Sequence, residues 1–136
     1  MTEVQRPPLP VLERRWRFAF WLAVVAGIVS ALWPQPVPNE PWFPGADKVE
    51  HALSFALLLW IGLRAGYRNP LALAIGLLAL GGAVELAQGS FTTTRSAEWL
   101  DWFADAAGIA FGWATAWFAA RRRTERSIRL EQEHGR

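Results

Sequence analysis

Eight polar side chains lie within or beside apolar stretches of this chain, and their types suit chemistry or the binding of charged groups. They are Asp47, Lys48, His51, Glu85, Gln88, Arg95, Asp101 and Asp105. An ionised side chain at the centre of a membrane helix costs roughly 2.5 to 3.5 kcal/mol on an insertion scale. Exposure to lipid is unfavourable nearer the helix ends as well. We therefore expect these side chains to face one another inside the protein.

Acid–base chemistry is available to three members of this set. The ordinary pKa of histidine lies near neutrality, and a carboxylate of Glu85 or Asp101 would be the partner of His51. These three are the candidate catalytic residues, and Arg95 would stabilise a phosphate or an oxyanion. No nucleophile is singled out, because the available hydroxyl side chains have no recognisable spacing from a base. They are Ser54, Ser90 and Thr92–Thr94.

Helical spacing places several of the polar side chains on shared faces. Asp47 and His51 are four residues apart, and Glu85 and Gln88 are three apart, so each pair lies on one face of a helix. The pair Gly81–Gly82 precedes Glu85 and would let another helix approach closely. The spacing therefore predicts inward polar stripes on two helices.

Two acids and two glycines form a similar stripe later in the chain. Asp101, Asp105, Gly108 and Gly112 follow one another at intervals of four, three and four residues. Two small residues four apart are typical of helices that pack closely in membranes. We expect Gly108 and Gly112 to pack against a neighbouring helix and to bring both carboxylates towards it.

Composition restricts the classes of function. The chain has 136 residues, which suits one domain, with 52% hydrophobic residues, 19% charged residues and nine Trp. Its formal net charge is +2. The arginines flank apolar segments, which is the pattern of cytoplasmic membrane flanks. We therefore expect no nucleic-acid partner.

The chain has no cysteine and two histidines. Disulfides, thiolate metal sites and cysteine nucleophiles are thereby excluded. Two histidines do not favour a zinc site built mainly from imidazoles. The sequence predicts no metal site and no cofactor.

Four apolar segments predict an all-α, polytopic membrane bundle with four transmembrane helices. We expect them at about Trp16–Trp33, from Ala46 or Asp47 to Arg64–Gly66, at Pro70–Gln88, and at about Glu98–Ala120. The first run spans about 27 Å as a helix, close to the bilayer core of about 30 Å. A cleaved signal peptide is the alternative for that run, but the proline-rich sequence after it is a poor cleavage site.

The segments divide the chain into three parts. Residues 1–15 read as a flexible cytoplasmic leader, 16–120 as the membrane domain, and 121–136 as a basic, charged cytoplasmic tail. A proline-rich loop is expected over 34–46, because five prolines there disfavour a helix.

Arginines predict the orientation. Those that flank the segments are Arg14, Arg15, Arg17, Arg64, Arg68 and Arg121–Arg123. With four crossings all of them fall on one side, which the positive-inside rule makes cytoplasmic, so that both termini are inside. The eight polar residues then share one depth near the extracytoplasmic face. We expect them to form one polar pocket there.

The ordered polar motifs resemble a family. Asp47-Lys48-x-x-His51, Glu85-x-x-Gln88, and the run from Arg95 through Asp101 and Asp105 to Gly108 and Gly112 are similar to motifs of the VanZ-like membrane proteins. The resemblance covers residues 16–120. It implies a multi-pass protein of the bacterial cytoplasmic membrane, in a family whose namesake is linked to low-level resistance to the glycopeptide teicoplanin. Many members have Asn where this chain has Asp105, so an ionised Asp105 adds a negative charge.

Three functions fit these observations. In the favoured one, the eight polar residues bind the head of an envelope lipid or a lipid-linked cell-wall precursor, with a role related to glycopeptide resistance. The second is a membrane-embedded hydrolase or transferase that acts on lipid head groups. The third is a structural clamp between helices. The sequence does not predict whether the protein is an enzyme or which oligomeric state it has.

Overall fold

A computed structural model of the chain describes residues 11–33, 43–91 and 99–134. These residues form four helices and no strand: α1 (Val11–Leu32), α2 (Ala46–Arg64), α3 (Pro70–Phe91) and α4 (Trp99–His134). The all-α prediction is confirmed. Most of the predicted proline-rich loop, residues 34–42, lies outside the described residues.

Local signals fix the turn between α2 and α3. Helix α2 ends with Arg64 in its last turn, and Gly66 follows with a φ of 74°, a left-handed conformation that glycine adopts without strain. Pro70 then begins α3, where its missing N–H costs nothing. The side-chain oxygen of Asn69 accepts a hydrogen bond of 3.0 Å from the N–H of Ala72 and so caps the helix.

Two helix boundaries differ from the sequence prediction. Helix α1 begins at Val11, so residues 11–15 of the expected leader are helical. Helix α4 runs without a break from Trp99 to His134, and its 36 residues span about 54 Å. The charged tail thus continues the last helix. An ion pair between Arg121 and Glu125 at 3.0 Å, one turn apart, supports this exposed part.

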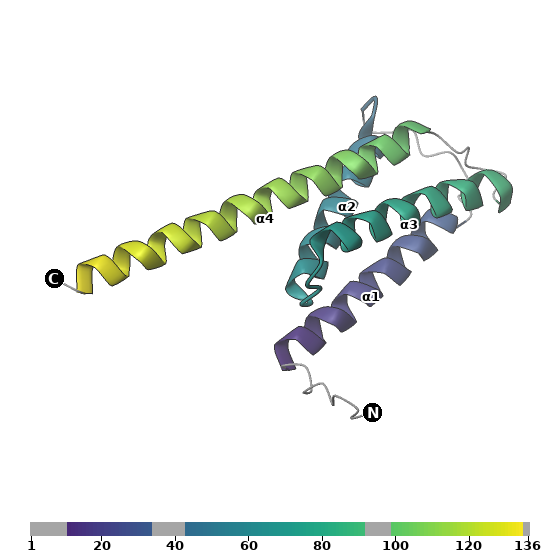
Figure 1. Cartoon of the computed structure of the whole chain (residues 1–136). Helices are drawn as coiled ribbons and strands as arrows, with labels where there is room; N and C mark the ends of the chain where they lie inside the picture. Colours follow the sequence, from purple (N-terminus) through teal and green to yellow (C-terminus); the bar gives the residue numbers. More distant parts are fainter. Residues whose placement is uncertain (1–10, 34–42, 92–98, 135–136) are drawn as a thin grey trace, which may run out of the picture.

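The helices alternate in direction (Figure 1). The carboxyl ends of α1 and α3 lie beside the amino ends of α2 and α4, and α4 projects past the other helices towards its own carboxyl end. We call the end of the bundle that carries Lys48, His51, Glu85 and Asp101 the polar end. The opposite end carries Arg17, Arg64 and Arg68 and is called the arginine end.

Helices α2 and α4 make the most extensive contact in the bundle. Gly108 packs directly on the backbone of Ala52, so closely that an added Cβ would overlap the carbonyl group of Ala52. One turn further on, a Cβ at Gly112 would stand 3.0 Å from the carbonyl oxygen of Ala56. The structure thus places both glycines of the stripe against α2.

Helix α2 lies at the centre of the bundle. Its Leu59 is fully buried, and the core around it draws side chains from every other helix. They are Phe20 and Val24 of α1, Ala74 and Leu77 of α3, and Ile109 of α4. At the arginine end, the guanidinium of Arg17 donates a hydrogen bond of 3.0 Å to the carbonyl of Ala65 and fastens α1 to the α2–α3 turn.

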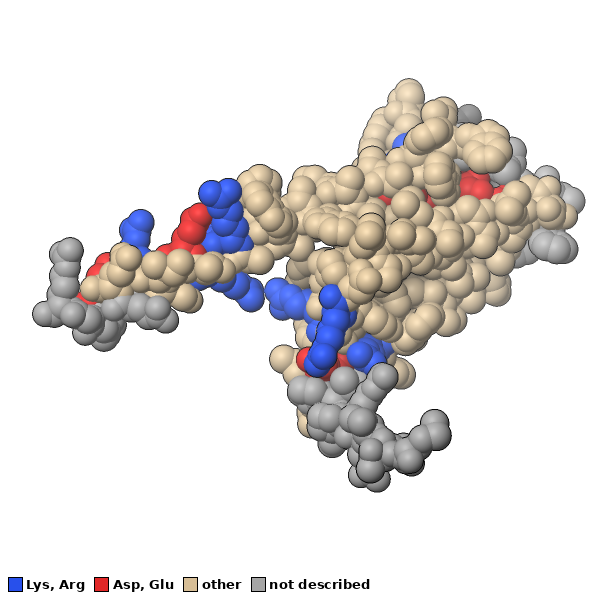
Figure 2. All heavy atoms as spheres, in the orientation of Figure 1, with Lys and Arg blue, Asp and Glu red and all other residues tan. Residues whose placement is uncertain are grey.

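The outside of the bundle is apolar as well. Large hydrophobic side chains of all four helices face outwards, for example Trp21, Leu53, Ile75 and Phe111, whose exposed fractions are 57, 62, 58 and 64%. Lys and Arg gather at the arginine end and along the outer part of α4, and the visible face between the two ends is almost uncharged (Figure 2). Contiguous exposed apolar surface is typical of proteins that contact a membrane or a partner protein.

Two described helices, α1 and α3, are long and apolar enough to cross a membrane by length and composition. The two other helices do not meet that criterion. Helix α2 carries Asp47, Lys48, Glu50 and Arg64 among its 19 residues, and Asp105 lowers the hydropathy of α4. The charged residues that reduce the apolar character of these helices include those of the polar end.

We expect Gly108→Ala to lower the stability of the bundle by about 1 to 3 kcal/mol, because the new methyl group must push α4 away from the α2 backbone. Gly27→Ala on α1 is the matched control. No atom lies within 4 Å of its added Cβ, so stability should be unchanged or higher by about 0.5 to 1 kcal/mol. Thermal unfolding in detergent, followed by circular dichroism, measures both; equal melting temperatures would contradict the close crossing.

Candidate functional site

Five polar side chains from three helices meet at the polar end. Helix α2 contributes Lys48 and His51, α3 contributes Glu85, and α4 contributes Asp101 and Asp105. The close crossing of α2 and α4 at Gly108 lies one turn beyond Asp105 and brings the two acids of α4 to the polar stripe of α2. We refer to these five residues as the polar cluster.

A buried histidine–aspartate pair forms its inner part. The Nδ1 atom of His51 lies 2.8 Å from Oδ1 of Asp105, which is 1% exposed. The carboxylate accepts the hydrogen bond that Nδ1–H donates. In a neutral ring, this arrangement leaves the lone pair on Nε2, where it is available to a proton or to a metal ion.

The other oxygen of Asp105, Oδ2, packs against Gly81 of α3, where an added Cβ would overlap it. No hydrogen-bond partner for Oδ2 is found among the described residues. Gly81 therefore makes room for the carboxylate between α3 and α4. The sequence singled out Gly81–Gly82 as a point of close helix approach, but spacing did not indicate that an acid occupies the space.

Lys48 and Asp101 form the outer part of the polar cluster. The ammonium of Lys48 lies 2.9 Å from Oδ1 of Asp101 and also pairs with its neighbour Asp47. The second oxygen of Asp101, Oδ2, lies 4.0 Å from Nε2 of His51. Asp101 thus stands between the ammonium and the imidazole, with a different oxygen turned to each.

Glu85 completes the polar cluster from α3. Its side chain is buried, with 7% exposed. One carboxylate oxygen of Glu85, one of Asp101 and a ring nitrogen of His51 all lie within 4.8 Å of one another. The three candidate catalytic residues of the sequence analysis are therefore neighbours, each from a different helix.

The remaining predicted residues have other surroundings. The buried amide of Gln88 donates a hydrogen bond of 3.0 Å to the carbonyl of Ala31 and ties α3 to the end of α1. Asp47 is about half-exposed and touches the polar cluster through Lys48. Arg95 lies outside the described residues. Ser54 and Ser90 are exposed, and Thr92–Thr94 also lie outside the described residues.

Trp102 makes a contact between helices that the spacing of polar residues in the sequence did not predict. Its indole N–H donates a hydrogen bond of 3.1 Å to the carbonyl of Leu78, and its ring lies against the open side of Gly82. This contact joins α4 to α3 directly beside the polar cluster. Gly82 was the feature of the sequence that could have indicated this contact, because a residue without a side chain exposes the helix backbone to a neighbouring helix.

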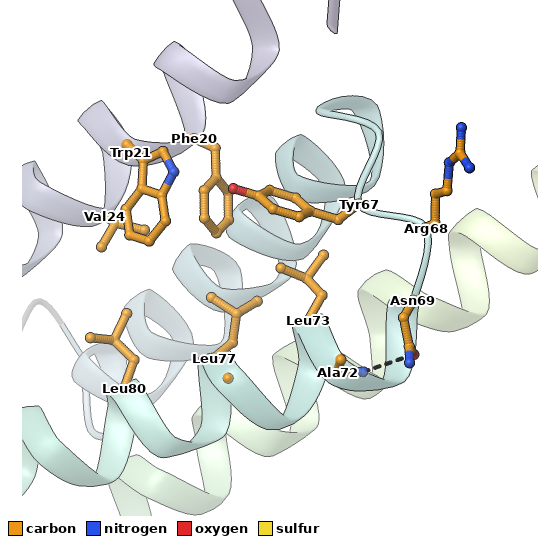
Figure 3. Close-up of a pocket in the computed structure, with 11 residues that line it drawn as sticks. Phe20, Trp21, Val24, Tyr67, Arg68, Asn69, Ala72, Leu73, Leu77 and Leu80 are labelled. Atoms are coloured by element: carbon orange, nitrogen blue, oxygen red, sulfur yellow. Dashed lines mark hydrogen bonds between the residues drawn. The ribbon is translucent and has the colours of Figure 1, made fainter. Parts of the chain in front are cut away.

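A separate apolar groove lies towards the arginine end, between α1 and α3 (Figure 3). Its volume is about 430 Å³, and Phe20, Trp21, Leu73 and Leu77 are among the side chains that line it. The turn residues Tyr67, Arg68 and Asn69 form its rim. No residue of the polar cluster lines this groove, so the groove and the polar cluster lie towards different ends of the bundle.

Fold and site together define a four-helix bundle with an apolar exterior and buried ionisable groups at one end. Comparison of the chain with protein-family models, with curated proteins and with solved structures finds no match. The resemblance to VanZ-like proteins thus remains an expectation from the sequence motifs.

We expect Asp105→Ala to destabilise the bundle by about 1 to 3 kcal/mol, because it removes the acceptor of the His51 hydrogen bond from a buried position. Asp105→Asn should cost less, since its side-chain oxygen still accepts that bond. Chemical unfolding in micelles, followed by tryptophan fluorescence, measures the difference. Asp47→Asn at a half-exposed position is the control and should be nearly neutral. Equal losses for Asp105→Asn and Asp105→Ala would argue against the hydrogen bond.

Proposed function

We propose that this chain is a multi-pass protein of the bacterial cytoplasmic membrane that binds the charged head of an envelope lipid, or of a lipid-linked cell-wall precursor, at the polar cluster. The observation that carries the proposal is the burial of several ionisable side chains at one end of a bundle whose exterior is apolar. Intramembrane ionisable groups are costly and most often serve function.

Uncharged segments in all four helices support four crossings. Residues 18–32, 52–63, 70–84 and 106–120 contain no acidic, basic or histidine side chain, and they are 15, 12, 15 and 15 residues long. As helices they extend about 18 to 23 Å, so the charged residues at their ends would lie near the edges of a bilayer core of about 30 Å. Exposed apolar side chains on every helix suit contact with lipid tails. The charged residues of α2 and α4 lie outside these uncharged segments, towards the helix ends, where head groups and water would be near.

Arginines support the orientation. Arg17, Arg64 and Arg68 lie at the arginine end, so the positive-inside rule places that end at the cytoplasmic surface and the polar end at the extracytoplasmic surface. The guanidinium of Arg64 lies over the ring of Trp60, 4.6 Å from its centroid. Such an amphipathic pair suits the head-group region.

The chemistry of the polar cluster suits a head group. The side chain of Lys48 is 27% exposed, so its ammonium can reach a phosphate without leaving Asp101. Asp101 and Glu85 offer acceptors for the hydroxyl or amino groups of a sugar or peptide. The resemblance to VanZ-like proteins directs the proposal to envelope lipids and to glycopeptide resistance.

We expect four crossings with both termini in the cytoplasm. Alkaline phosphatase fused within 34–42 or 92–98 should be active, while fusions at Tyr67 or after Arg136 should be inactive. Fluorescent-protein fusions at Tyr67 and Arg136 give the reverse readout and serve as the control. The physical reason is that the arginine-rich flanks stay on the cytoplasmic side. Termini on opposite sides of the membrane would contradict the topology.

We expect a bacterial envelope lipid to co-purify with the protein. Native mass spectrometry of the full chain, released from detergent, should show a lipid-bound peak that Lys48→Ala and Arg95→Ala each weaken about tenfold, the effect of losing one charged hydrogen bond. Arg68→Ala removes an exposed cation at the arginine end and is the matched control. The proposal fails if the wild type carries no lipid, or if the peak is as strong in Lys48→Ala as in Arg68→Ala.

A further inference from the structure

We propose that the polar cluster is also a metal site, in which His51, Glu85 and Asp101 bind one divalent transition-metal ion. These residues come from three different helices, yet one potential ligand atom from each lies within 4.8 Å of the other two. The inference is independent of lipid binding, because it concerns only what these side chains hold. It departs from the sequence prediction of no metal, which considered sites made of cysteine or of several histidines.

The histidine is oriented as in known metal sites. A metal-binding imidazole usually donates its other ring N–H to a carboxylate or carbonyl, which fixes the tautomer and the direction of the ring. The hydrogen bond from Nδ1 of His51 to buried Asp105 has this form, at 2.8 Å. It directs Nε2 towards Asp101.

The carboxylate of Asp101 is also oriented by a contact with a second side chain, that of Lys48. Oδ1 of Asp101 lies 2.9 Å from the ammonium of Lys48, while Oδ2 faces Nε2 of His51 at 4.0 Å. A separation of 4.0 Å is too long for a hydrogen bond. Two ligand atoms that bind the same ion, each at about 2.0 to 2.2 Å from it, can lie 4.0 Å from each other. Lys48 thus holds one oxygen of Asp101 and leaves the other for the ion.

Charge favours a cation at this position. The described residues of the polar end include five carboxylates and one ammonium, that of Lys48. The carboxylates belong to Asp47, Glu50, Glu85, Asp101 and Asp105. A dication between His51, Glu85 and Asp101 would offset part of this negative charge.

The ligand types select the ion. One imidazole nitrogen and two carboxylate oxygens, without thiolate, suit Zn²⁺, Mn²⁺ or Fe²⁺ better than Cu⁺ or Ca²⁺. Three protein ligands leave a further position open on a zinc ion. The side chains of His51 and Asp101 are 21 and 13% exposed, so that position is on the outer side of the polar cluster. An anionic oxygen of a ligand would bind there.

The test uses the full chain, purified through a tag without histidine, stripped with EDTA and placed in nanodiscs of phosphatidylcholine. Zn²⁺ content after dialysis is measured by mass spectrometry, and Co²⁺ is titrated to follow its visible absorption. We expect about one ion per chain and a zinc-dependent rise in melting temperature. Glu85→Gln, Asp101→Asn and His51→Gln should each weaken binding by at least about 100-fold, because each removes a ligand, and loss of a group that only supports a ligand already costs about 10- to 100-fold.

Two matched controls isolate the site. Glu50→Gln changes an exposed acid beside His51, and His134→Gln changes the second histidine of the chain; both should bind as the wild type does. The inference is overturned if stripped wild-type protein takes up far less than one ion. Undiminished binding in a Glu85→Gln or Asp101→Asn variant with native circular dichroism also overturns it. If those variants do not fold, a wild-type melting temperature that is the same with zinc and with EDTA overturns it.

Discussion

The structure depends on the close approach of α4 to the backbone of α2 at Gly108. Any larger side chain there would separate the two helices. The separation would also lengthen the hydrogen bond between Asp105 and His51, which lies one turn away. The glycine thus sets the distance at which a buried acid and an imidazole share a hydrogen bond. Lys48 and Asp101 add an ion pair one turn nearer the helix ends. Packing and charge therefore specify the same register between the two helices.

Burial of charge constrains the rest of the bundle. Asp105 is almost completely covered, so the bundle must keep water and lipid away from it and still leave space for its two oxygens. Gly81 supplies that space on the α3 side. Trp102 and Gln88 then close the neighbouring gaps with hydrogen bonds to backbone carbonyls of α3 and α1. Four helices thus support one short polar region.

The sequence was sufficient for the four described helices and for the proximity of His51, Glu85 and Asp101. Apolar segments separated by proline and glycine indicate the number of helices, and alternating direction puts His51, Glu85 and Asp101 at one end. Individual partners depend on how each helix is rotated, which single-helix spacing does not give. Asp105 therefore meets His51, and Gln88 turns to α1. Apolar periodicity does not predict that α4 continues past Ala120, because a charged helix carries no apolar signal.

Helix α4 is one uninterrupted rod from the aspartates of the polar cluster to the charged residues beyond the bundle (Figure 1). No break within its described length absorbs a twist or a tilt. No loop therefore separates Asp101 and Asp105 from the segment around Arg126, although about 54 Å lies between the two ends of the helix.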